Sequence, residues 1–436
     1  MVNQNKTTTS QDIGEVSIEK HLNIRRENMK RIILLMLGAL FVIFLAACNG
    51  ESEESKVEND VSESDTIKIG SLHPLTGATA SEGQEMKNAI QLAVDQKNAE
   101  GGIKSLDGMK VELIAGDHED NQEKGNSEVQ RMSNEGVVGI IGPYSSVEFT
   151  ATQEAEKEGI PFIIDVGSHD DLTARGLKYT FRVQPMASFM ANDFLKHFKN
   201  INEDFEGEIK TAVISHEDSH FGTFFGEFIE EHADKIGLDI LDRLPHSAAT
   251  ADLSSDVNKI KSLEPDVLIA TTFLPDGKLL IDTLKGSGFT AKVIIGVANG
   301  AFSNTSFITE DTDTNQYILD TNYALNPNNE LTEQVKEEYR EKYGKELGPN
   351  SALSYESARV LLEAIEKAGS TDTEKIREAL QDTNIEDTIL AQGPIIFDES
   401  GQNKNAQAVL NQIVDGKSVI VLPEDIQVET PIYPLP

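Results

Sequence analysis

The sequence predicts an α/β protein built from two units with parallel sheets. Short apolar runs typical of β-strands alternate with longer segments whose apolar residues recur at helical spacing. This order of elements occurs twice, first over residues 66–164 and again over 211–295. Strand-helix-strand order is typical of parallel sheets with helices on both faces. The length of 436 residues is enough for two or three domains of roughly 100–200 residues each.

The first unit shows the alternation most clearly. Its first helix is predicted from Met86, Ala89 and Ile90, which share one helical face, and the pair Gly101-Gly102 ends it. Residues 137–141, which precede the turn Gly142-Pro143, are apolar throughout, as expected of a strand buried on both faces. The expected strands are 66–70, 111–114, 137–141 and 160–164, and the expected helices are 83–98, 127–135 and 150–158.

The second unit repeats this order and is followed by further elements. Its expected strands are 211–214, 240–241, 267–270 and 293–295, and its expected helices are 223–236, 253–263 and 279–287. Helices at 331–343, 352–368 and 375–381 follow, and then strands at 394–397, 408–414 and 419–422. Ligands of open α/β sheets bind at the carboxyl ends of the strands, so two such units facing each other predict a ligand cleft between them.

Charge and composition exclude several classes of function. There are 38 Lys and Arg against 74 Asp and Glu, a formal net charge of −36, whereas nucleic-acid binding requires a basic surface. The single cysteine excludes internal disulfides and metal or iron–sulfur sites built from several thiolates. The sequence contains no nucleotide-binding glycine motif and no C-x-x-C pair. We therefore expect no cofactor and no nucleic acid.

The one cysteine, Cys48, lies at the end of an apolar segment near the start of the chain. The basic pair Lys30-Arg31 is followed by the uncharged run 32–47, which is short for a membrane-spanning helix. A basic region, an apolar run and small residues are typical of a secretory signal. The end of the run, Leu45-Ala46-Ala47-Cys48, resembles a bacterial lipobox, which implies lipidation of Cys48.

This interpretation divides the first 65 residues into three parts. Residues 1–28 are polar and precede Met29, so we expect them to be an upstream extension. Residues 29–47 are the expected lipoprotein signal peptide, and 48–65 an acidic flexible tether with too few apolar residues to fold. The protein is then expected at the cell membrane, lipid-anchored on the extracytoplasmic face.

Two short motifs suggest enzymes but lie in the wrong context. His216-Glu217-Asp218-Ser219-His220 matches the H-E-x-x-H pattern of zinc proteases, which requires both histidines on one helix face. Here the motif spans a predicted strand-to-helix loop, so we expect its residues to line the cleft. A secreted metalloenzyme that uses His216 and His220 remains an alternative.

The second motif, Ser168-His169-Asp170, contains the residue types of a catalytic triad. Triads are assembled in space rather than from sequence neighbours, and there is no G-x-S-x-G elbow. Ser168 follows a predicted strand and is expected to donate a hydrogen bond to ligand. Five histidines follow predicted strands, but a metal site requires several ligands that converge. We expect no metal. The five are His73, His118, His169, His216 and His220.

Many short motifs follow one another along the chain. They are Ile67-Lys68-Ile69-Gly70, Pro74-Leu75-Thr76-Gly77, Gly83-Gln84-Glu85-Met86, Asn98 with Gly101-Gly102, Ile141-Gly142-Pro143 with Ser145-Ser146, Phe181-Arg182, Pro265-Asp266-Val267, Tyr355 with Ala358, and Gly393-Pro394-Ile395 with Phe397-Asp398 and Gly401. Their order and spacing resemble the branched-chain amino-acid-binding proteins, which are extracytoplasmic substrate-binding components of ABC importers. The resemblance covers nearly all of 66–425.

The resemblance implies the type I periplasmic-binding-protein fold. This fold has two Rossmann-like lobes joined by three crossovers, with a ligand cleft that closes by hinge motion. Lobe 1 would comprise 66–186 plus 322–404, and lobe 2 would comprise 187–321 plus 405–436. No reaction is catalysed in this family, so we expect a binding protein rather than an enzyme.

The resemblance also implies ligand-binding positions in lobe 1. In the family, serine hydroxyls and backbone N–H groups after the third and fourth strands hold an α-amino-acid carboxylate. These positions fall on Ser145 or Ser146 and on Val166, Gly167 and Ser168. Hydroxyl and N–H groups suit this role because they donate to an anion without adding a charge of their own.

The implied positions in lobe 2 depart from the family pattern. The acid that binds the ligand's ammonium should fall near Ala298 or Asn299, and neither is acidic. Two aromatic positions fall on Phe221 and Phe273, and the second lacks the family's hydroxyl. An aromatic residue of the first loop is replaced by Glu82.

This departure leaves two interpretations of the ligand. A buried ammonium without a carboxylate partner is costly, so Glu82 or Asp218 supplies the charge from a new direction, or the ligand is not an α-amino acid. Amides, urea-like compounds, short peptides and organic acids then become candidates.

The function expected from these observations is delivery of a small ligand to an ABC importer. The ligand is expected to be a hydrophobic or branched-chain amino acid or a related metabolite. The partners are the ligand and the permease subunits, with the protein itself a monomer. The alternative is a sensor that uses the same domain to report its ligand to a membrane receptor.

Overall fold

The computed structural model describes residues 66–77, 79–144, 147–204 and 207–434. The expected signal peptide, Cys48 and the acidic tether lie outside the described residues, as do Ser145 and Ser146. Every helix within the described ranges is too short or too polar to span a bilayer.

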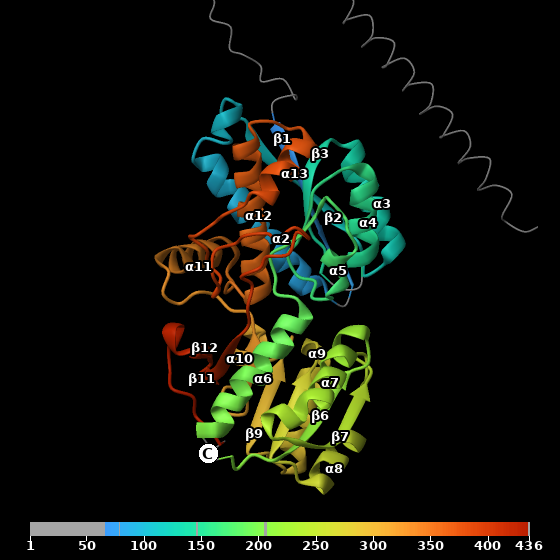
Figure 1. Ribbon diagram of the computed structural model, residues 1–436, viewed down its shortest axis with the longest axis vertical. Coiled ribbons are helices and arrows are strands. Elements are labelled where there is room, and N and C mark those ends of the chain that lie inside the picture. Colours follow the sequence, from blue (N-terminus) through green and yellow to red (C-terminus); the bar gives the residue numbers. More distant parts are fainter. Residues whose placement is uncertain (1–65, 78, 145–146, 205–206, 435–436) are drawn as a thin grey trace, which may run out of the picture. The chain divides into compact units, whose positions relative to one another are not determined.

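Lobe 1 is built on a five-stranded parallel sheet with the strand order β2-β1-β3-β4-β5 (Figure 1). Its strands are β1 (Thr66–His73), β2 (Lys110–Asp117), β3 (Val137–Gly142), β4 (Phe162–Ile164) and β5 (Thr180–Arg182). In β1, Ile67 and Ile69 face one apolar cluster and Leu72 faces the other, as the two-residue period of a strand requires. The central strand is therefore buried on both faces.

Helices cover both faces of this sheet. The clusters of buried side chains place α2 (Ala80–Ala99), α11 (Glu330–Tyr343), α12 (Pro349–Ala368) and α13 (Thr373–Gln381) on one face. They place α3 (Gln122–Asn134), α4 (Glu148–Glu158) and α5 (Asp171–Ala174) on the other. The first turn of α2 lies so close to the preceding loop that a Cβ on Gly83 would come within 2.0 Å of the Pro74 carbonyl oxygen. Only glycine permits this approach.

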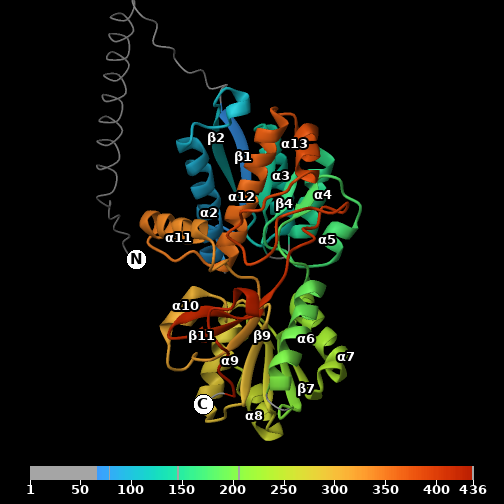
Figure 2. The same cartoon turned by 60° about the vertical axis from the view of Figure 1, so that its left-hand side comes forward.

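Lobe 2 is built on a seven-stranded sheet with the order β12-β11-β10-β9-β8-β6-β7. The strands are β6 (Thr211–Glu217), β7 (Asp239–His246), β8 (Val267–Thr271), β9 (Val293–Val297), β10 (Leu319–Asn322), β11 (Val409–Val414) and β12 (Lys417–Leu422). β6 to β10 are parallel, whereas β11 and β12 pair antiparallel. Figure 2 shows β11, from the C-terminal end of the chain, among elements from its middle.

The helices of lobe 2 also lie on both faces of their sheet. Buried side chains of α6 (Ala187–Asp204) and α7 (His220–His232) form one cluster with the sheet. Those of α8 (Ser254–Leu263), α9 (Leu274–Ser287) and α10 (Thr305–Glu310) form another. The chain passes between the lobes three times, after β5, after β10 and before β11. These connections are the three crossovers that the sequence predicts.

The structure differs from the sequence-based expectations in three respects. The expected strand at 394–397 is wrong: Ile395 and Phe397 form only isolated bridges, with Ile385 and Asn403. The long helix α6 is absent from the expectations although its buried residues follow helical spacing. The elements β5, β10, α5 and α10, each three to six residues long, were not predicted either.

Candidate functional site

The expected ligand-binding residues that the structure describes follow the carboxyl ends of parallel strands or begin the next helix. In lobe 1, Glu82 lies in the first turn of α2, and 166–168 follows β4. In lobe 2, Asp218 and Phe221 follow β6, Phe273 follows β8, and 298–299 follows β9. Ligands of such sheets bind at these ends, so the described positions are consistent with one site between the lobes.

The loop after β4 is held by a fully buried polar network. His73 at the end of β1 donates from Nε2 to Asp165 Oδ2 at 2.8 Å, and Ser71 Oγ lies 2.9 Å from the other ring nitrogen. Ser354 of α12 donates to the same Asp165 oxygen at 2.5 Å. The Val166 N–H donates to Asp165 Oδ1 at 2.7 Å. The network joins β1, β4 and α12, and it holds Asp165, the first residue of the loop, in place.

Ser71, His73 and Asp165 have the residue types and connectivity of a catalytic triad. All three side chains are fully buried, so the hydroxyl cannot meet a substrate. The sequence motif Ser168-His169-Asp170 forms no such relay, because His169 turns toward His220 of lobe 2. The geometry gives neither set of residues the arrangement of a hydrolase.

Arg182 supports the same loop from beneath. Its guanidinium is fully buried and donates to the carbonyl oxygens of Gly167 at 2.9 Å and His169 at 2.7 Å, and to Gln402 Oε1 at 2.6 Å. Burial lowers the pKa of Arg182 to about 10. It has no ion-pair partner within the described residues, so a buried positive charge lies directly behind the loop that is expected to bind ligand.

The backbone N–H groups of this loop are largely engaged within the protein. The Gly167 N–H donates to Gln184 Oε1, and Val166 is bonded to Asp165 as above. The Ser168 carbonyl accepts from the Ala187 N–H at 2.7 Å, but its hydroxyl forms no hydrogen bond with any described residue. Ser168 is therefore the member of this loop best placed to donate to a ligand.

The neighbouring loop after β3 contains a residue that the sequence did not single out. Tyr144 has φ +60°, a left-handed conformation that is rare for a large side chain. The buried His118 holds the preceding turn, because its Nε2 donates to the Pro143 carbonyl at 2.8 Å while Nδ1 accepts from the Asp120 N–H at 3.1 Å. Burial lowers the pKa of His118, which favours this neutral form.

Lobe 2 presents an aromatic pair to the expected site. The rings of Phe221 and Phe273 stack with centroids 5.7 Å apart and an interplanar angle of 28°. Phe225 packs edge-on against Phe221 at 5.3 Å. Asp218 is exposed, whereas the neighbouring Glu217 is buried and accepts from Ser219 and Gly222 at the start of α7. The surface here is apolar, without a free buried acid among the described side chains.

Asn299, which the resemblance places near the position expected for the family's acid, is fully engaged in the turn after β9. Its Oδ1 accepts from Thr272 Oγ1 and from the N–H groups of Ala301 and Phe302, at 2.9–3.1 Å. Its Nδ2 donates to the Ala270 carbonyl at 3.0 Å. The side chain is fully buried, so its role in this structure is to hold the turn.

The nearest buried acid to this turn is Asp320 of β10. One of its oxygens accepts from the Asn299 N–H at 3.2 Å and the other from the Asn322 amide at 3.0 Å. Burial raises the pKa of Asp320 to about 7. Ala298, between the two strands, is buried and has φ +51°. Both acid oxygens are thus occupied by the lobe's own donors.

Two side-chain contacts join the lobes beside these residues. His169 and His220 lie with their Nε2 atoms 2.7 Å apart and their rings edge to face. The Asn304 amide donates to Glu82 Oε1 at 3.4 Å. The histidine pair was not predicted, although both residues follow predicted strands.

The histidine contact depends on the neutral form of His169. The Asp171 N–H donates to His169 Nδ1 at 3.1 Å, so His169 carries its proton on Nε2 and donates to His220. Burial, and then the neighbouring His220, lower the pKa of His169, while Asp170 and Asp171 oppose this shift and Arg182 adds to it. Because the pKa of His169 is lowered, the contact stabilises this arrangement of the lobes fully above the ordinary histidine pKa of about 6.5, and it is lost as the pH falls through the lowered pKa of His169.

We expect acidification to separate the lobes of the ligand-free protein. Small-angle scattering at pH 7.5 and 5.5 should show a larger radius of gyration at the lower pH. His169→Leu should remove most of this difference, whereas His232→Leu, on the outer end of α7, should keep it. An equal response in the wild type and His169→Leu would contradict the role of the pair.

The H-E-x-x-H residues do not form a metal site in this structure. His216 is buried, with Nδ1 near the Glu217 carbonyl and Nε2 3.2 Å from the Arg243 guanidinium, whereas His220 faces His169. Glu217 caps α7 instead of acting as a base. Within the described ranges, no group of three or more His, Cys, Asp or Glu side chains is arranged to hold a metal ion. The metalloenzyme alternative has no geometric support.

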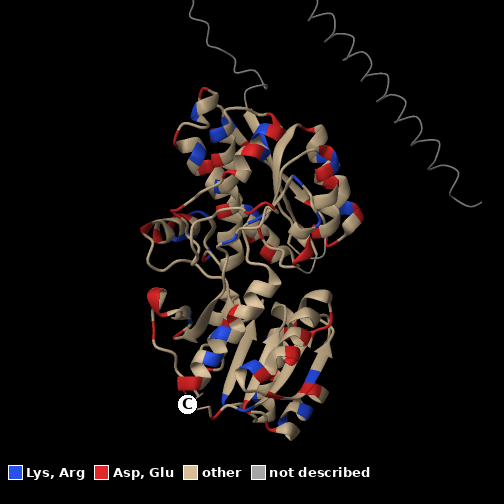
Figure 3. Ribbon diagram, viewed as in Figure 1, with Lys and Arg blue, Asp and Glu red and all other residues tan. Residues whose placement is uncertain are grey.

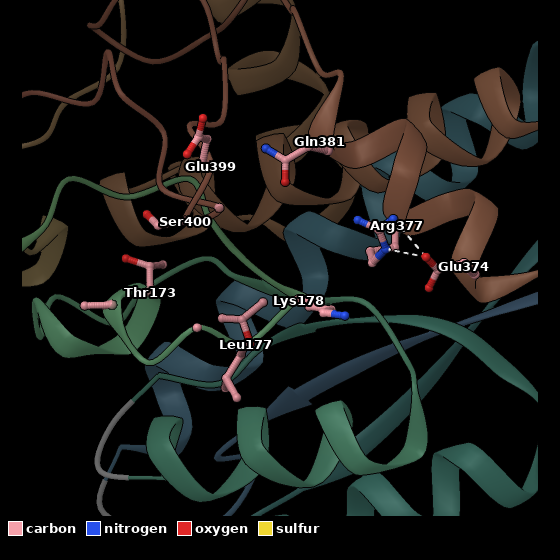
Figure 4. Close-up of a pocket in the computed structure, with 12 residues that line it drawn as sticks. Thr173, Leu177, Lys178, Glu374, Arg377, Gln381, Glu399 and Ser400 are labelled. Carbon is pink, nitrogen blue, oxygen red and sulfur yellow. Dashed lines mark hydrogen bonds and ion pairs between the residues drawn. The ribbon is translucent and has the colours of Figure 1, made fainter.

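Two surface cavities are lined by other residues than those of the expected site. One of about 560 Å³ is in lobe 1, between the segment 173–180, α13 and residues 399–401 (Figure 4). Arg377 and Glu374 form an ion pair at its edge, and Lys178 lies nearby. The other, of about 610 Å³, is lined by residues of 326–334 and by Asp387. Neither cavity contains an expected ligand-binding residue.

Acidic and basic residues are mixed on the outer helices of both lobes (Figure 3).

Two parallel-stranded lobes, three crossovers and polar loops at facing strand ends define the class of two-lobed ligand-binding proteins. Comparison with known families makes this specific: a model described as "Periplasmic binding protein" matches residues 66–417. The chain belongs to this family of binding proteins. The fold is that of type I periplasmic binding proteins, as the sequence predicts.

Two relatives from Brucella are named as homologues of a Leu/Ile/Val-binding protein. The chain is 31% identical over 371 residues to "Leu/Ile/Val-binding protein homolog 7" of Brucella suis, covering 82% of this chain and 92% of the relative. It is 32% identical over 372 residues to "Leu/Ile/Val-binding protein homolog 8" of Brucella abortus, with 82% and 91% covered.

Solved structures agree on the fold. The leucine-binding protein LivK of Thermotoga maritima superimposes with a TM-score of 0.70 at 25% identity, covering 82% of this chain and 99% of that one. LivJ of Streptococcus pneumoniae, solved with isoleucine, gives 0.70 at 22% identity, covering 81% and 97%.

Proposed function

We propose that this chain is an extracytoplasmic substrate-binding protein that delivers a hydrophobic amino acid, or a close relative of one, to an ABC importer. The observation that supports this most strongly is the placement of Ser168, Phe221 and Phe273 at facing strand ends in a chain of this family. The hydroxyl suits a ligand carboxylate, and the stacked rings suit an apolar side chain. The names of the Brucella relatives and of LivK support the same ligand class.

A thermal-shift panel on the full chain tests the ligand class. Leucine, isoleucine, valine and phenylalanine are compared with small amides, urea and organic acids. A ligand present at 100 times its Kd should add about 2.7 kcal/mol to the free energy of unfolding, which is a clear shift in Tm. A response confined to amides or acids would replace the amino-acid assignment and keep the binding-protein role. No response to any of them would contradict the proposal.

The proposed carboxylate site predicts a specific loss. Ser168→Ala should weaken binding of the responding ligand by about 1–3 kcal/mol, because a buried anion loses a donor. Ser146→Ala should act similarly if its hydroxyl shares the role. Ser262→Ala, on the outer face of α8, is the matched control and should bind normally. Unchanged affinity in both site variants would rule out this site.

We further propose that Cys48 is lipidated and anchors the protein to the membrane, with residues 49–65 as the tether. Cys48→Ala should release the protein from the membrane fraction in a cell fractionation experiment, while the secreted chain still binds ligand. Full membrane retention of the variant would contradict the anchor. The permease pair is the expected partner, and a monomer is the expected state.

A further inference from the structure

Among the described residues of lobe 2, no buried carboxylate is free to bind a ligand's ammonium. Asn299 is engaged in its own turn, Asp320 accepts from two donors, and Asp218 is exposed. The remaining surface is the Phe221–Phe273 pair, which offers apolar contact and ring faces. Apart from the exposed Asp218, the described acids that could meet a ligand's ammonium therefore lie in lobe 1.

Three carboxylates of lobe 1 act on the Tyr144 hydroxyl, and they are Glu82, Asp120 and Glu148. Glu148 begins α4, and Glu82 lies in the first turn of α2. Both acids are close enough to raise the pKa of the Tyr144 hydroxyl, after burial as the main cause. Neither Glu148 nor Tyr144 was singled out from the sequence.

Glu148 also contacts the loop after β4. A Cβ on Gly167 would come within 3.0 Å of Glu148 Cγ, so the absence of a side chain at Gly167 gives Glu148 its space. The acid thus lies against the loop of Gly167 and Ser168, which is expected to hold the ligand's carboxylate. In an α-amino acid the ammonium is bonded to the carbon next to that carboxylate, so a group at Glu148 can reach it.

The Glu148 carboxylate has no hydrogen-bond or ion-pair partner among the described side chains. Burial raises the pKa of Glu148 to about 7, although Arg182 opposes the shift. Burial also raises the pKa of Glu82, followed by repulsion from Glu85, while Lys345 lowers it. Glu148 is half-buried and Arg182 already acts on it as a cation, so a second cation bound beside Glu148 would further favour its ionised form.

We propose that Glu148, assisted by Glu82, binds the ammonium or another cationic N–H group of the ligand and takes the place of the acid missing from lobe 2. The apolar part of the ligand then packs on Phe221 and Phe273. The site consequently selects ligands with an amine and discriminates against the corresponding acids. This inference rests on the proposed function and specifies how its site recognises ligand.

Calorimetric titration of the full chain with three related probes tests the assignment. Leucine has both charged groups, isoamylamine lacks the carboxylate, and 4-methylpentanoate lacks the amine. Glu148→Gln should weaken leucine and isoamylamine by about 10–100-fold and leave 4-methylpentanoate unchanged or tighter. Glu82→Gln should act in the same direction with a smaller effect. Glu154→Gln, on the same helix but bonded to Gln130 and Lys157, should change affinity less than twofold.

Proton linkage gives a readout that a merely structural role would not produce. A bound ammonium favours the ionised Glu148, so leucine should release protons on binding between about pH 6 and 7.5. Titration in two buffers of different ionisation enthalpy measures this release. The charged or titratable groups nearby are Glu82, Tyr144, Arg182 and His169, and the release should disappear in Glu148→Gln.

The outcomes separate the inference from the proposed function. Leucine binding that is equal in the wild type and Glu148→Gln overturns the inference and leaves the function intact. Binding of isoamylamine without leucine supports the amine subsite and overturns the amino-acid assignment. Binding of 4-methylpentanoate alone, or of none of the probes, overturns the inference together with the amino-acid assignment.

Discussion

Arg182→Met should lower the free energy of unfolding by about 3–5 kcal/mol. The guanidinium is fully buried, and its removal leaves the carbonyls of Gly167 and His169 and the amide of Gln402 without their donor. Methionine fills part of the volume but donates no hydrogen bond. The loop after β4 should also lose its fixed position, so ligand affinity should fall with stability.

Denaturant unfolding of the wild type and variant measures the first effect, and ligand titration at low temperature measures the second. Arg131→Met is the matched control, because Arg131 pairs with Glu128 and Glu135 on the surface of α3. Exposed pairs of this kind contribute about 0–1 kcal/mol. A loss for Arg182→Met no larger than that of the control would show that the buried guanidinium does not support the loop.

Asn299→Asp should be destabilising at neutral pH in spite of restoring an acid near the family's position. The new carboxylate loses the bond from Nδ2 to the Ala270 carbonyl and lies beside Asp320, whose pKa burial already raises to about 7. Two buried acids with no cation should decrease the free energy of unfolding by about 3–5 kcal/mol.

The pH dependence of this variant has a definite sign. Both acids bind protons more tightly in the folded state than in the unfolded state, so the loss should be largest above pH 7 and shrink as the pH falls toward 5. Thermal unfolding at several pH values measures it. Asn121→Asp, at the exposed N-cap of α3, should be neutral because aspartate caps equally well. A variant as stable as this control at pH 7.5 would contradict the structural role of Asn299.

The regular parts of both lobes could be predicted because their local patterns agree with their surroundings. β3 is apolar throughout because it is buried on both faces, and α12 carries a continuous apolar stripe because it covers the sheet. The missed helix α6 had the same periodicity, with Met190, Phe194 and Phe198 on one face. It connects the lobes rather than continuing the strand-helix order, so the repeat alone did not indicate it.

The strand expected at 394–397 shows a different limit. Apolar residues there are buried against the lobe 1 core, but the backbone pairs only at single bridges. A short apolar run shows that a segment is buried and does not show which partner its backbone meets.

The loops of the expected site were easier to predict from the sequence than the contacts of the side chains in them. A strand end indicated the loop of Ser168, the resemblance implied Phe221 and Phe273, and the loop context led us to expect no metal site at His216 and His220. Glu148 was missed because its importance depends on contact with Gly167, which is distant in sequence. Asn299 was named as a ligand position, but only the structure shows that its amide is occupied by the turn.

The discontinuous make-up of the lobes has a consequence for the order of folding. The face of the first sheet formed by β1 to β5 is covered by α12 and α13, which begin at Pro349 and Thr373. During synthesis at roughly 5–20 residues per second, this apolar face is complete on the order of ten seconds before its cover is made. The second sheet likewise waits for β11 and β12. A nascent or truncated chain therefore carries exposed core surface, and this protein depends on its last hundred residues, or on a chaperone until they arrive, to avoid aggregation.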